Sequence, residues 1–301
     1  MYRPDDYTDT WSEESIKHKS YKGGEMKVFY HSSDLDGHCS GAIVSLMHPE
    51  CELIGINYGD DFPWDSIKEK EIVFMVDFSL QPFEDMERLN HISKLTWIDH
   101  HKTAINQAYD RGFLANQQVL ETNKAACELV WDFFHPGVHN EAVRLLGRYD
   151  VWDLQTGTLE LQSGLRMHNT FPENRELWTR LLEGDVSFLE ETLQTGKILL
   201  QKKEIDDKIY AQACAFETEL DGLRCIALNR GLTNSKILDS VYDPEIHDAM
   251  LIFVWRKSKW TVSLYSDQPQ VDVSKICKKR GGGGHDNAAG FQCKKLPFDL
   301  K

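Results

Sequence analysis

Short apolar runs alternate with polar and helical stretches along the first half of the chain. Four runs are rich in Val, Ile and aromatic residues, as is typical of buried strands, and they cover residues 28–30, 53–57, 72–76 and 95–98. Apolar residues at helical spacing predict helices at 41–47, 83–92, 123–134 and 140–149. This alternation predicts an α/β domain in which helices flank a mostly parallel sheet.

A different pattern follows in the second half. Residues 173–212 carry leucines at helical spacing without a strand signal, and we expect Gly184 and Gly196 to divide this stretch into separate helices. Strands are predicted at 223–228, 250–256, 260–265 and 291–293, and helices at 234–242 and 272–279. The predicted organisation is an N-terminal arm (1–24), an α/β domain (25–172), a helical connector (173–213) and a smaller α/β domain with a mixed sheet (214–301).

Three of the predicted strands lead directly into acidic residues or histidines. His31, Asp34 and Asp36 follow the first strand, Asp77 follows 72–76, and Asp99, His100 and His101 follow 95–98. We expect Asp34 and Asp36 to lie in an extended turn, where residues two apart share one side of the chain. Because ligands of open parallel sheets bind beyond the carboxyl ends of the strands, the sequence predicts a metal site at this edge.

The carboxylates of this site set the number of cations that it can neutralise. The direct ligands among them are Asp34, Asp36, Asp77 and Asp150. They supply about four negative charges, which two divalent cations would cancel. Asp99 is better used to hold an imidazole in the correct tautomer, and Asp153 is the alternative to Asp150 if its helix ends early. Carboxylate and imidazole ligands without thiolate favour Mn²⁺, with Mg²⁺, Co²⁺ or Fe²⁺ as alternatives.

A run of four glycines near the end of the chain is the second candidate binding element. Residues 281–284 are all glycine and precede His285. Adjacent glycines let backbone N–H groups converge on an anion. Lys278, Lys279 and Arg280 lie just upstream and favour phosphate binding, and His285 can donate a hydrogen bond to the same group. The alternatives are a flexible loop and a solvated basic face.

Composition limits the classes of partner. The net charge of −14 argues against sequence-independent binding to long duplex DNA, which depends on a broad basic surface, but it permits a small phosphorylated substrate. We expect no membrane-spanning helix and no secretory signal, because neither a long apolar segment nor an apolar signal region is present in the sequence. The seven cysteines form no CxxC pair, which favours reduced thiols and a cytoplasmic location over a zinc site. Exposed sheet edges suggest a homodimer.

Together, these motifs identify a resemblance. Asp34-Leu-Asp36-Gly37, Asp77, the triplet of Asp99, His100 and His101, Asp150 and the glycine run before His285 occur in the order found in the DHH phosphoesterase superfamily with a C-terminal DHHA1 domain. The resemblance covers about residues 27–291, and its first motif is most similar to the nanoRNase and cyclic-nucleotide phosphodiesterase branch.

The resemblance implies a role for each matching residue. One metal ion would be bound by His31 and Asp34, the other by Asp36, His100 and Asp150, and Asp77 would bridge the two. His101 would contact the scissile phosphate, and Gly282, Gly283, Gly284 and His285 would hold the substrate. The chain departs from the family pattern at His31, which lies three residues before Asp34 where many members have four, with a proline between.

The implied activity is hydrolysis of short oligonucleotides, dinucleotides or cyclic nucleotides to mononucleotides by a two-metal phosphodiesterase. Alternatives are an inorganic pyrophosphatase or polyphosphatase, which uses similar metal motifs, and a non-catalytic nucleotide-binding protein. A processive exonuclease needs additional binding domains, for which the chain has no length left.

Overall fold

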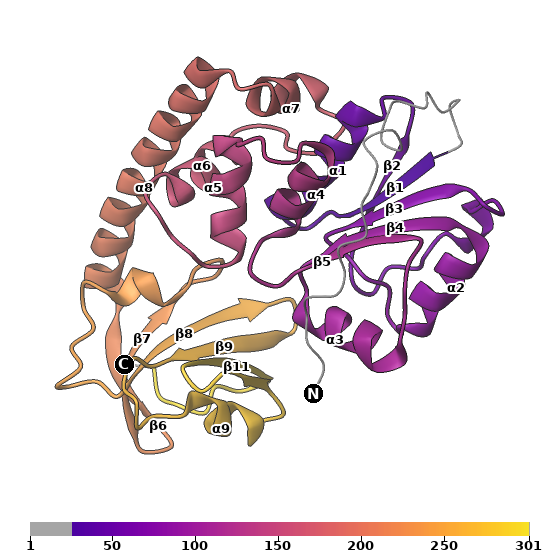
Figure 1. Cartoon of the computed structure of the whole chain (residues 1–301). Coiled ribbons are helices and arrows are strands. Elements are labelled where there is room, and N and C mark those ends of the chain that lie inside the picture. Colours follow the sequence, from indigo (N-terminus) through magenta and orange to yellow (C-terminus); the bar gives the residue numbers. More distant parts are fainter. Residues whose placement is uncertain (1–25, 301) are drawn as a thin grey trace, which may run out of the picture. The chain divides into compact units, whose positions relative to one another are not determined.

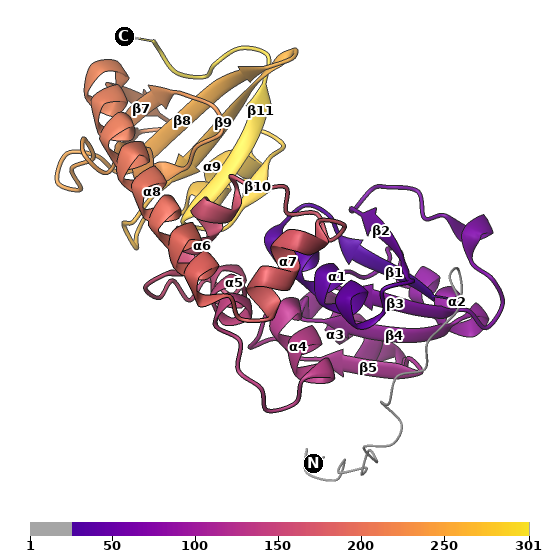
Figure 2. The same cartoon turned by 90° about the horizontal axis from the view of Figure 1, so that it is seen from above.

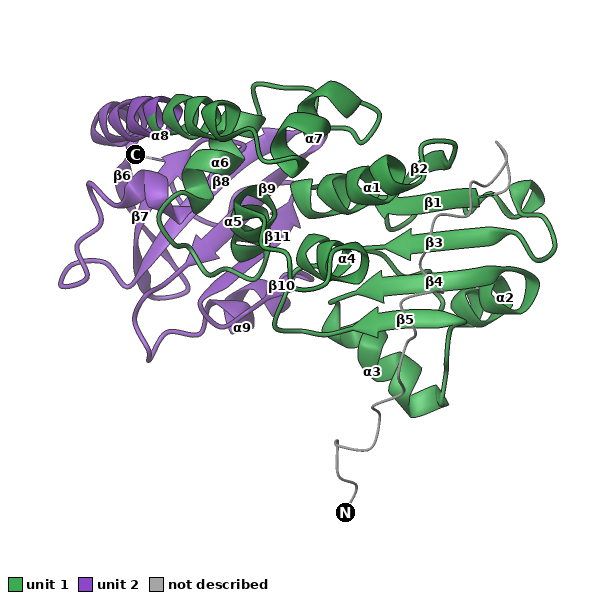
Figure 3. Cartoon of the chain, turned by 45° about the horizontal axis from the view of Figure 1, so that its top comes forward, with its two compact units in different colours: residues 1–197 green, residues 198–301 purple. Residues whose placement is uncertain are grey.

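The computed structural model describes residues 26–300, so the predicted N-terminal arm lies outside the described residues. The chain divides into two compact units, Met1–Lys197 and Ile198–Lys301 (Figure 3). The division falls inside one long helix, α8 (Val186–Cys214). The domain limits expected at residues 172 and 213 stay predictions.

The first unit is built on a five-stranded parallel sheet with the strand order β2-β1-β3-β4-β5 (Figure 1). The strands are β1 (Met26–His31), β2 (Glu52–Ile56), β3 (Ile72–Val76), β4 (Lys94–Asp99) and β5 (Gln117–Leu120). The predicted parallel α/β sheet is therefore confirmed. The sequence did not predict β5, whose four residues are only half-buried.

Helices cover both faces of this sheet, and strand residues alternate between the two cores. In β1, Val28 and Tyr30 face the core formed with α1 (Leu35–Met47), α4 (Ala126–Phe134) and α5 (Glu141–Asp150), whereas Phe29 faces α2 (Glu84–Ile92) and α3 (Lys102–Arg111). A short 3₁₀ turn, η1 (Trp64–Ser66), lies between β2 and β3. The polar sequence of α3 gave no helical signal, but Ala104 and Ala108 pack it onto the sheet.

Helix α1 begins earlier than its apolar spacing predicted. It was expected to open at Gly41 but begins at Leu35, because the Asp34 side chain caps it and accepts a hydrogen bond from the Gly37 amide at 2.9 Å. The expected extended turn over Asp34 and Asp36 is therefore wrong, since Asp36 is helical. Gly37 permits this tight start: a Cβ there would lie 1.9 Å from the His31 carbonyl oxygen.

Three further helices complete the first unit or lead out of it, and they are α6 (Thr158–Leu165), α7 (Arg175–Leu182) and the 29-residue α8. The expected break at Gly184 lies between α7 and α8, but the expected break at Gly196 is wrong, because α8 continues through it. Gly196 instead lets α8 approach α6. None of the helices between residues 26 and 300 is long and apolar enough to span a membrane.

We expect Gly196→Ala to destabilise the first unit, although alanine has the higher helix propensity. A Cβ at this position would lie 1.7 Å from the Glu160 carbonyl oxygen, so the two helices must separate. The loss should exceed the ~1 kcal/mol of propensity gained and amount to about 2–3 kcal/mol net. Urea unfolding measures it, with Gln194→Ala on the exposed face of α8 as a near-neutral control. Equal midpoints for the two variants would refute the close approach.

The second unit is a six-stranded mixed sheet with the order β10-β11-β9-β8-β7-β6, and Figure 2 labels its strands β7 to β11. Its strands are β6 (Phe216–Leu220), β7 (Leu223–Asn229), β8 (Ala249–Arg256), β9 (Lys259–Tyr265), β10 (Gly283–Gly284) and β11 (Ala288–Cys293). Helix α9 (Val273–Lys278) packs on one face through Val273 and Ile276, and the opposite face carries η2 (Ser235–Leu238) and Tyr210 of α8. The helix predicted at 234–242 is thus only a short 3₁₀ turn.

Candidate metal centre

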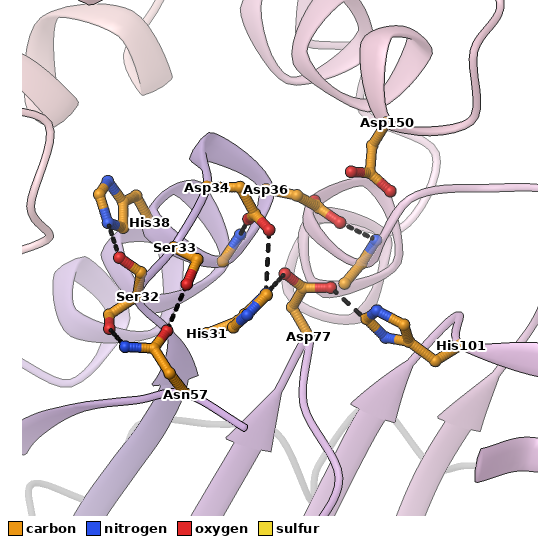
Figure 4. Close-up of polar contacts among 12 residues, drawn as sticks. His31, Ser32, Ser33, Asp34, Asp36, His38, Asn57, Asp77, His101 and Asp150 are labelled. Atoms are coloured by element: carbon orange, nitrogen blue, oxygen red, sulfur yellow. Dashed lines mark hydrogen bonds and ion pairs between the residues drawn. The ribbon is translucent and has the colours of Figure 1, made fainter. Parts of the chain in front are cut away.

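The predicted ligands meet at the carboxyl edge of the parallel sheet (Figure 4). The chain leaves β1 toward β2 and then returns to β3 on the other side of β1, so β1 and β3 form the topological switch point at which open α/β sheets bind ligands. His31 is the last residue of β1 and Asp77 directly follows β3. Asp99 ends the neighbouring strand β4, which brings His100 and His101 to the same edge.

Asp77 lies at the centre of this group. It is 1% exposed, and neither carboxylate oxygen accepts a hydrogen bond. Its two oxygens face different neighbours: Oδ2 lies 3.6 Å from His31 Nδ1, and Oδ1 lies 3.4 Å from His100 Nε2. Its backbone is left-handed, with φ of 55°, while its amide donates to the Ile98 carbonyl. Aspartate tolerates this conformation better than most residues, and such strain is common at functional sites.

Two triads of possible ligands meet around Asp77, which belongs to the first of them. The first triad consists of His31, Asp34 and Asp77, and the second of Asp36, His100 and Asp150. Within each triad the candidate ligand atoms lie within 4.8 Å of one another. His31 Nδ1 lies 2.9 Å from Asp34 Oδ2, and His100 Nε2 lies 3.2 Å from Asp150 Oδ2. The structure thus brings together all six residues predicted as metal ligands.

The open choice between Asp150 and Asp153 can be judged from their neighbours. Asp150 is the last residue of α5, and its Oδ2 lies 3.2 Å from His100 Nε2. Asp153 instead accepts a hydrogen bond from the Gln155 side chain at 2.9 Å and lies 3.5 Å from Arg148. The geometry therefore favours Asp150.

Asp36 joins the second triad to the start of helix α4. It is 3% exposed, and its two oxygens accept hydrogen bonds from the amides of Ala126 and Cys127 at 2.9 and 2.7 Å. These amides belong to the first turn of α4, where the helix dipole favours a negative charge. Burial and the charges of Asp77 and Asp150 nevertheless raise the pKa of Asp36.

Asp99 organises the two histidines without being a candidate ligand itself. Its Oδ1 accepts hydrogen bonds from the His100 and His101 amides, and it lies 2.7 Å from His101 Nδ1. This contact orients the His101 ring and leaves its Nε2 for another partner. The role predicted for Asp99, to hold an imidazole in the correct tautomer, stays a prediction. His101 also belongs to a third possible ligand group, with Asp77 and His100.

The electrostatics of the cluster fit bound cations. Burial, followed by the charges of Asp34 and Asp99, raises the pKa of Asp77 to about 7. The neighbouring carboxylates of Asp34 and then Asp77 raise the pKa of His31 to about 10. Buried carboxylates are normally hydrogen-bonded, and Asp77 is not. Two orphaned, buried oxygens among imidazoles and carboxylates, without thiolate, are a suitable environment for Mn²⁺ or Mg²⁺.

The affinity for Mn²⁺ should rise steeply with pH. A ligand must be deprotonated, so binding releases a proton from His31 below pH 10 and from Asp77 below pH 7. Each released proton corresponds to about a tenfold gain in affinity per pH unit. Isothermal titration calorimetry should therefore give a steeper dependence at pH 6–7 than at pH 7–9. His31→Gln should lower the slope by one proton, and an unchanged affinity from pH 6 to 9 would contradict the assignment.

The glycines expected to bind substrate are engaged in backbone contacts within the second unit. Gly283 and Gly284 form strand β10 rather than a loop, and Gly282 packs so closely that a Cβ would lie 2.1 Å from the Gly290 carbonyl oxygen. The backbone amides of Gly281, Gly282 and His285 all donate to backbone carbonyls. These three amides are therefore not free to bind an anion, and the predicted anion nest is wrong for them.

Arg280 is held by a bidentate ion pair with Asp221, at 2.6 and 2.9 Å. His285, in contrast, is exposed. The predicted substrate-binding role of Arg280 and residues 282–285 stays a prediction.

Sequence reasoning missed three residues that pack around the ligands. Tyr58 and Phe78 each place a ring centroid 5.8 Å from that of His31. His38 fixes the loop before α1, because its ring nitrogens contact the Ser32 carbonyl and the Thr170 hydroxyl at 3.1 and 3.0 Å. A signal was present for two of them: Tyr58 comes just after β2, and Phe78 directly follows Asp77.

Comparison with solved structures identifies the fold. A pGpG-specific phosphodiesterase, PggH from Vibrio cholerae, aligns with a TM-score of 0.50 at 16% identity over 89% of this chain and 92% of its own. The DHH domain of a protein described as a member of a ribosomal protein family also aligns with a TM-score of 0.50, at 14% identity over 88% of this chain and 82% of its own. Neither protein-family models nor curated sequences gave a match. The chain has the fold of the DHH superfamily, as its motifs predicted.

Proposed function

We propose that this chain is a metal-dependent phosphoesterase that cleaves short oligonucleotides, dinucleotides or cyclic nucleotides to mononucleotides. The observation that carries the proposal is Asp77, whose two buried oxygens accept no hydrogen bond and face His31 of the first triad and His100 of the second. A carboxylate in this position is suited to bridging two cations. The motif resemblance and the shared DHH fold support the reaction class.

In this proposal each group of residues has a distinct task. His31 and Asp34 would hold one cation, Asp36, His100 and Asp150 the other, and Asp77 both. Bound divalent cations lower the pKa of water and offset charge on a phosphoryl group. Asp99 orients His101, whose Nε2 can donate to a phosphate oxygen. Hydrolysis forms a bond from the water oxygen to phosphorus, breaks the ester P–O bond and transfers a proton to the leaving oxygen.

Crystals soaked in Mn²⁺ test the number of ions. We expect two anomalous peaks, one beside each triad and both within coordination distance of Asp77, because about four carboxylate charges require two divalent cations for neutrality. Asp99 should not contact either peak, since it belongs to none of the groups of candidate ligand atoms and its Oδ1 holds His100 and His101. A single peak remote from Asp77 would overturn the two-metal proposal.

The substrate class is tested with one panel of compounds. The protein is incubated with Mn²⁺ and RNAs of two to ten nucleotides, cyclic mono- and dinucleotides, or pyrophosphate, and the products are separated. Release of mononucleotides from dinucleotides or cyclic nucleotides supports the proposal. Faster turnover of pyrophosphate would replace it with a pyrophosphatase, and binding without products would indicate a non-catalytic nucleotide-binding protein.

A further inference from the structure

A cavity of about 250 Å³ lies beside the metal centre within the first unit. Its walls come from the segment after β2 and from the residues after β3, and include Tyr58, Phe62, Trp64 and Phe78. Tyr58 and Phe78 line the cavity and also contact His31. The cavity and the candidate metal centre therefore share a wall.

Tyr58 provides an aromatic surface between the two sites. Its ring packs on Phe78, with centroids 4.6 Å apart, and is nearly perpendicular to the ring of His101, with centroids 6.5 Å apart. The residue is nevertheless 50% exposed. A ring that is supported on one side and exposed on the other is a suitable surface for stacking a planar ligand.

The polar groups of the cavity select the chemistry of that ligand. Asp60, Asp61 and Asp85 contribute carboxylates, Asn57 and Gln81 contribute amides, and no basic side chain is among the residues that line it. Asp60 already accepts a hydrogen bond from the backbone amide of Asn57 at 2.8 Å. Asp61 and Asp85 are therefore the freer hydrogen-bond acceptors. Carboxylates repel phosphate and accept hydrogen bonds from N–H groups, so this cavity suits an uncharged, planar N–H donor.

We infer that this cavity binds one nucleobase of the substrate and prefers guanine to uracil. The inference rests on the proposed phosphoesterase function, because the metal centre would hold the phosphate next to the cavity. Guanine offers adjacent ring N–H and amino donors that match one carboxylate, whereas uracil offers a single N–H. Tyr58 would stack on the base, and Asp61 or Asp85 would accept its N–H groups.

Steady-state kinetics with the dinucleotides pGpG and pUpU, in Mn²⁺, test the inference. We expect kcat/KM to be at least about tenfold higher for pGpG. Asp61→Asn or Asp85→Asn should bring this ratio toward one. Tyr58→Ala should raise KM for both dinucleotides about tenfold with a smaller change in kcat, and Tyr58→Phe should restore it. Tyr109→Ala and Asp110→Asn, exposed on α3, are matched controls that should change neither value.

The outcomes separate this inference from the proposed function. Equal kcat/KM for the two dinucleotides, or a guanine preference that survives both aspartate variants, overturns the base pocket and leaves the phosphoesterase intact. If neither dinucleotide is hydrolysed, the proposed function fails for them, and calorimetry with GMP, UMP and ribose 5-phosphate still tests the cavity. Tighter binding of GMP that is lost in Tyr58→Ala supports the pocket, and equal affinities for the three ligands refute it.

Discussion

The Asp77→Asn variant is expected to lose hydrolysis by a factor on the order of 10³ or more and yet to be more stable than the wild type without metal. Activity falls because the variant loses the carboxylate that belongs to the first triad and lies 3.4 Å from His100 of the second. Stability rises because the ionised Asp77 is buried without a hydrogen-bond donor, and asparagine removes that charge while tolerating the left-handed backbone. His31 keeps Asp34 as its nearer partner.

The pH dependence of this gain has a definite sign. The pKa of Asp77 is raised from 3.8 to about 7 in the folded protein, so the folded state holds this proton more tightly than the unfolded state. The contribution of the protonated Asp77 to the free energy of unfolding is therefore fully present below about pH 4 and is lost as the pH rises through 7. The Tm difference between Asp77→Asn and the wild type, measured in EDTA, should therefore grow from pH 4 to 8. Mn²⁺ should raise the Tm of the wild type but not that of the variant.

Asp110→Asn on exposed α3 is the control and should change neither Tm nor activity. A lower Tm for metal-free Asp77→Asn at pH 8, or a full response of this variant to Mn²⁺, would contradict the central role of Asp77.

Asp36→Ala is expected to abolish hydrolysis as completely as Asp77→Asn does. Unlike Asp77→Asn, it should lower the stability of the metal-free protein. Unlike Asp77, Asp36 accepts two hydrogen bonds, from the amides of Ala126 and Cys127 at the start of α4. Alanine leaves these buried donors unsatisfied, which costs about 1–3 kcal/mol and outweighs the relief of charge repulsion with Asp77 and Asp150. Thermal unfolding in EDTA measures the loss.

Asp36→Asn separates the two tasks of this residue. Its amide oxygen still accepts one of the two hydrogen bonds, so it should recover much of the stability while activity stays lost. Equal Tm values for Asp36→Ala and the wild type would show that the cap of α4 contributes nothing. Hydrolysis by Asp36→Asn at the wild-type rate would remove Asp36 from the predicted ligands.

The parts of the fold that were predicted correctly are those in which a local pattern decides the structure. The apolar runs that became β1, β3 and β4 are buried on both faces, so their sequence is apolar throughout except at Thr96. The start of α1 was missed because its first turns contain buried polar residues, such as Asp36, His38 and Ser40. Gly196 was misread as a helix break because its reason is a contact with Glu160, 36 residues earlier.

The same distinction applies to the candidate site. The sequence by itself determined which side chains follow the strands, and therefore that carboxylates and imidazoles meet at one edge of a parallel sheet. Only the tertiary structure decided that Asp77 has no hydrogen-bond donor while Asp36 has two, that Asp150 rather than Asp153 faces His100, and that Tyr58 borders a cavity. The physical reason is that strand ends follow from the local periodicity of the chain, whereas hydrogen-bond partners and cavities depend on which distant segments pack together.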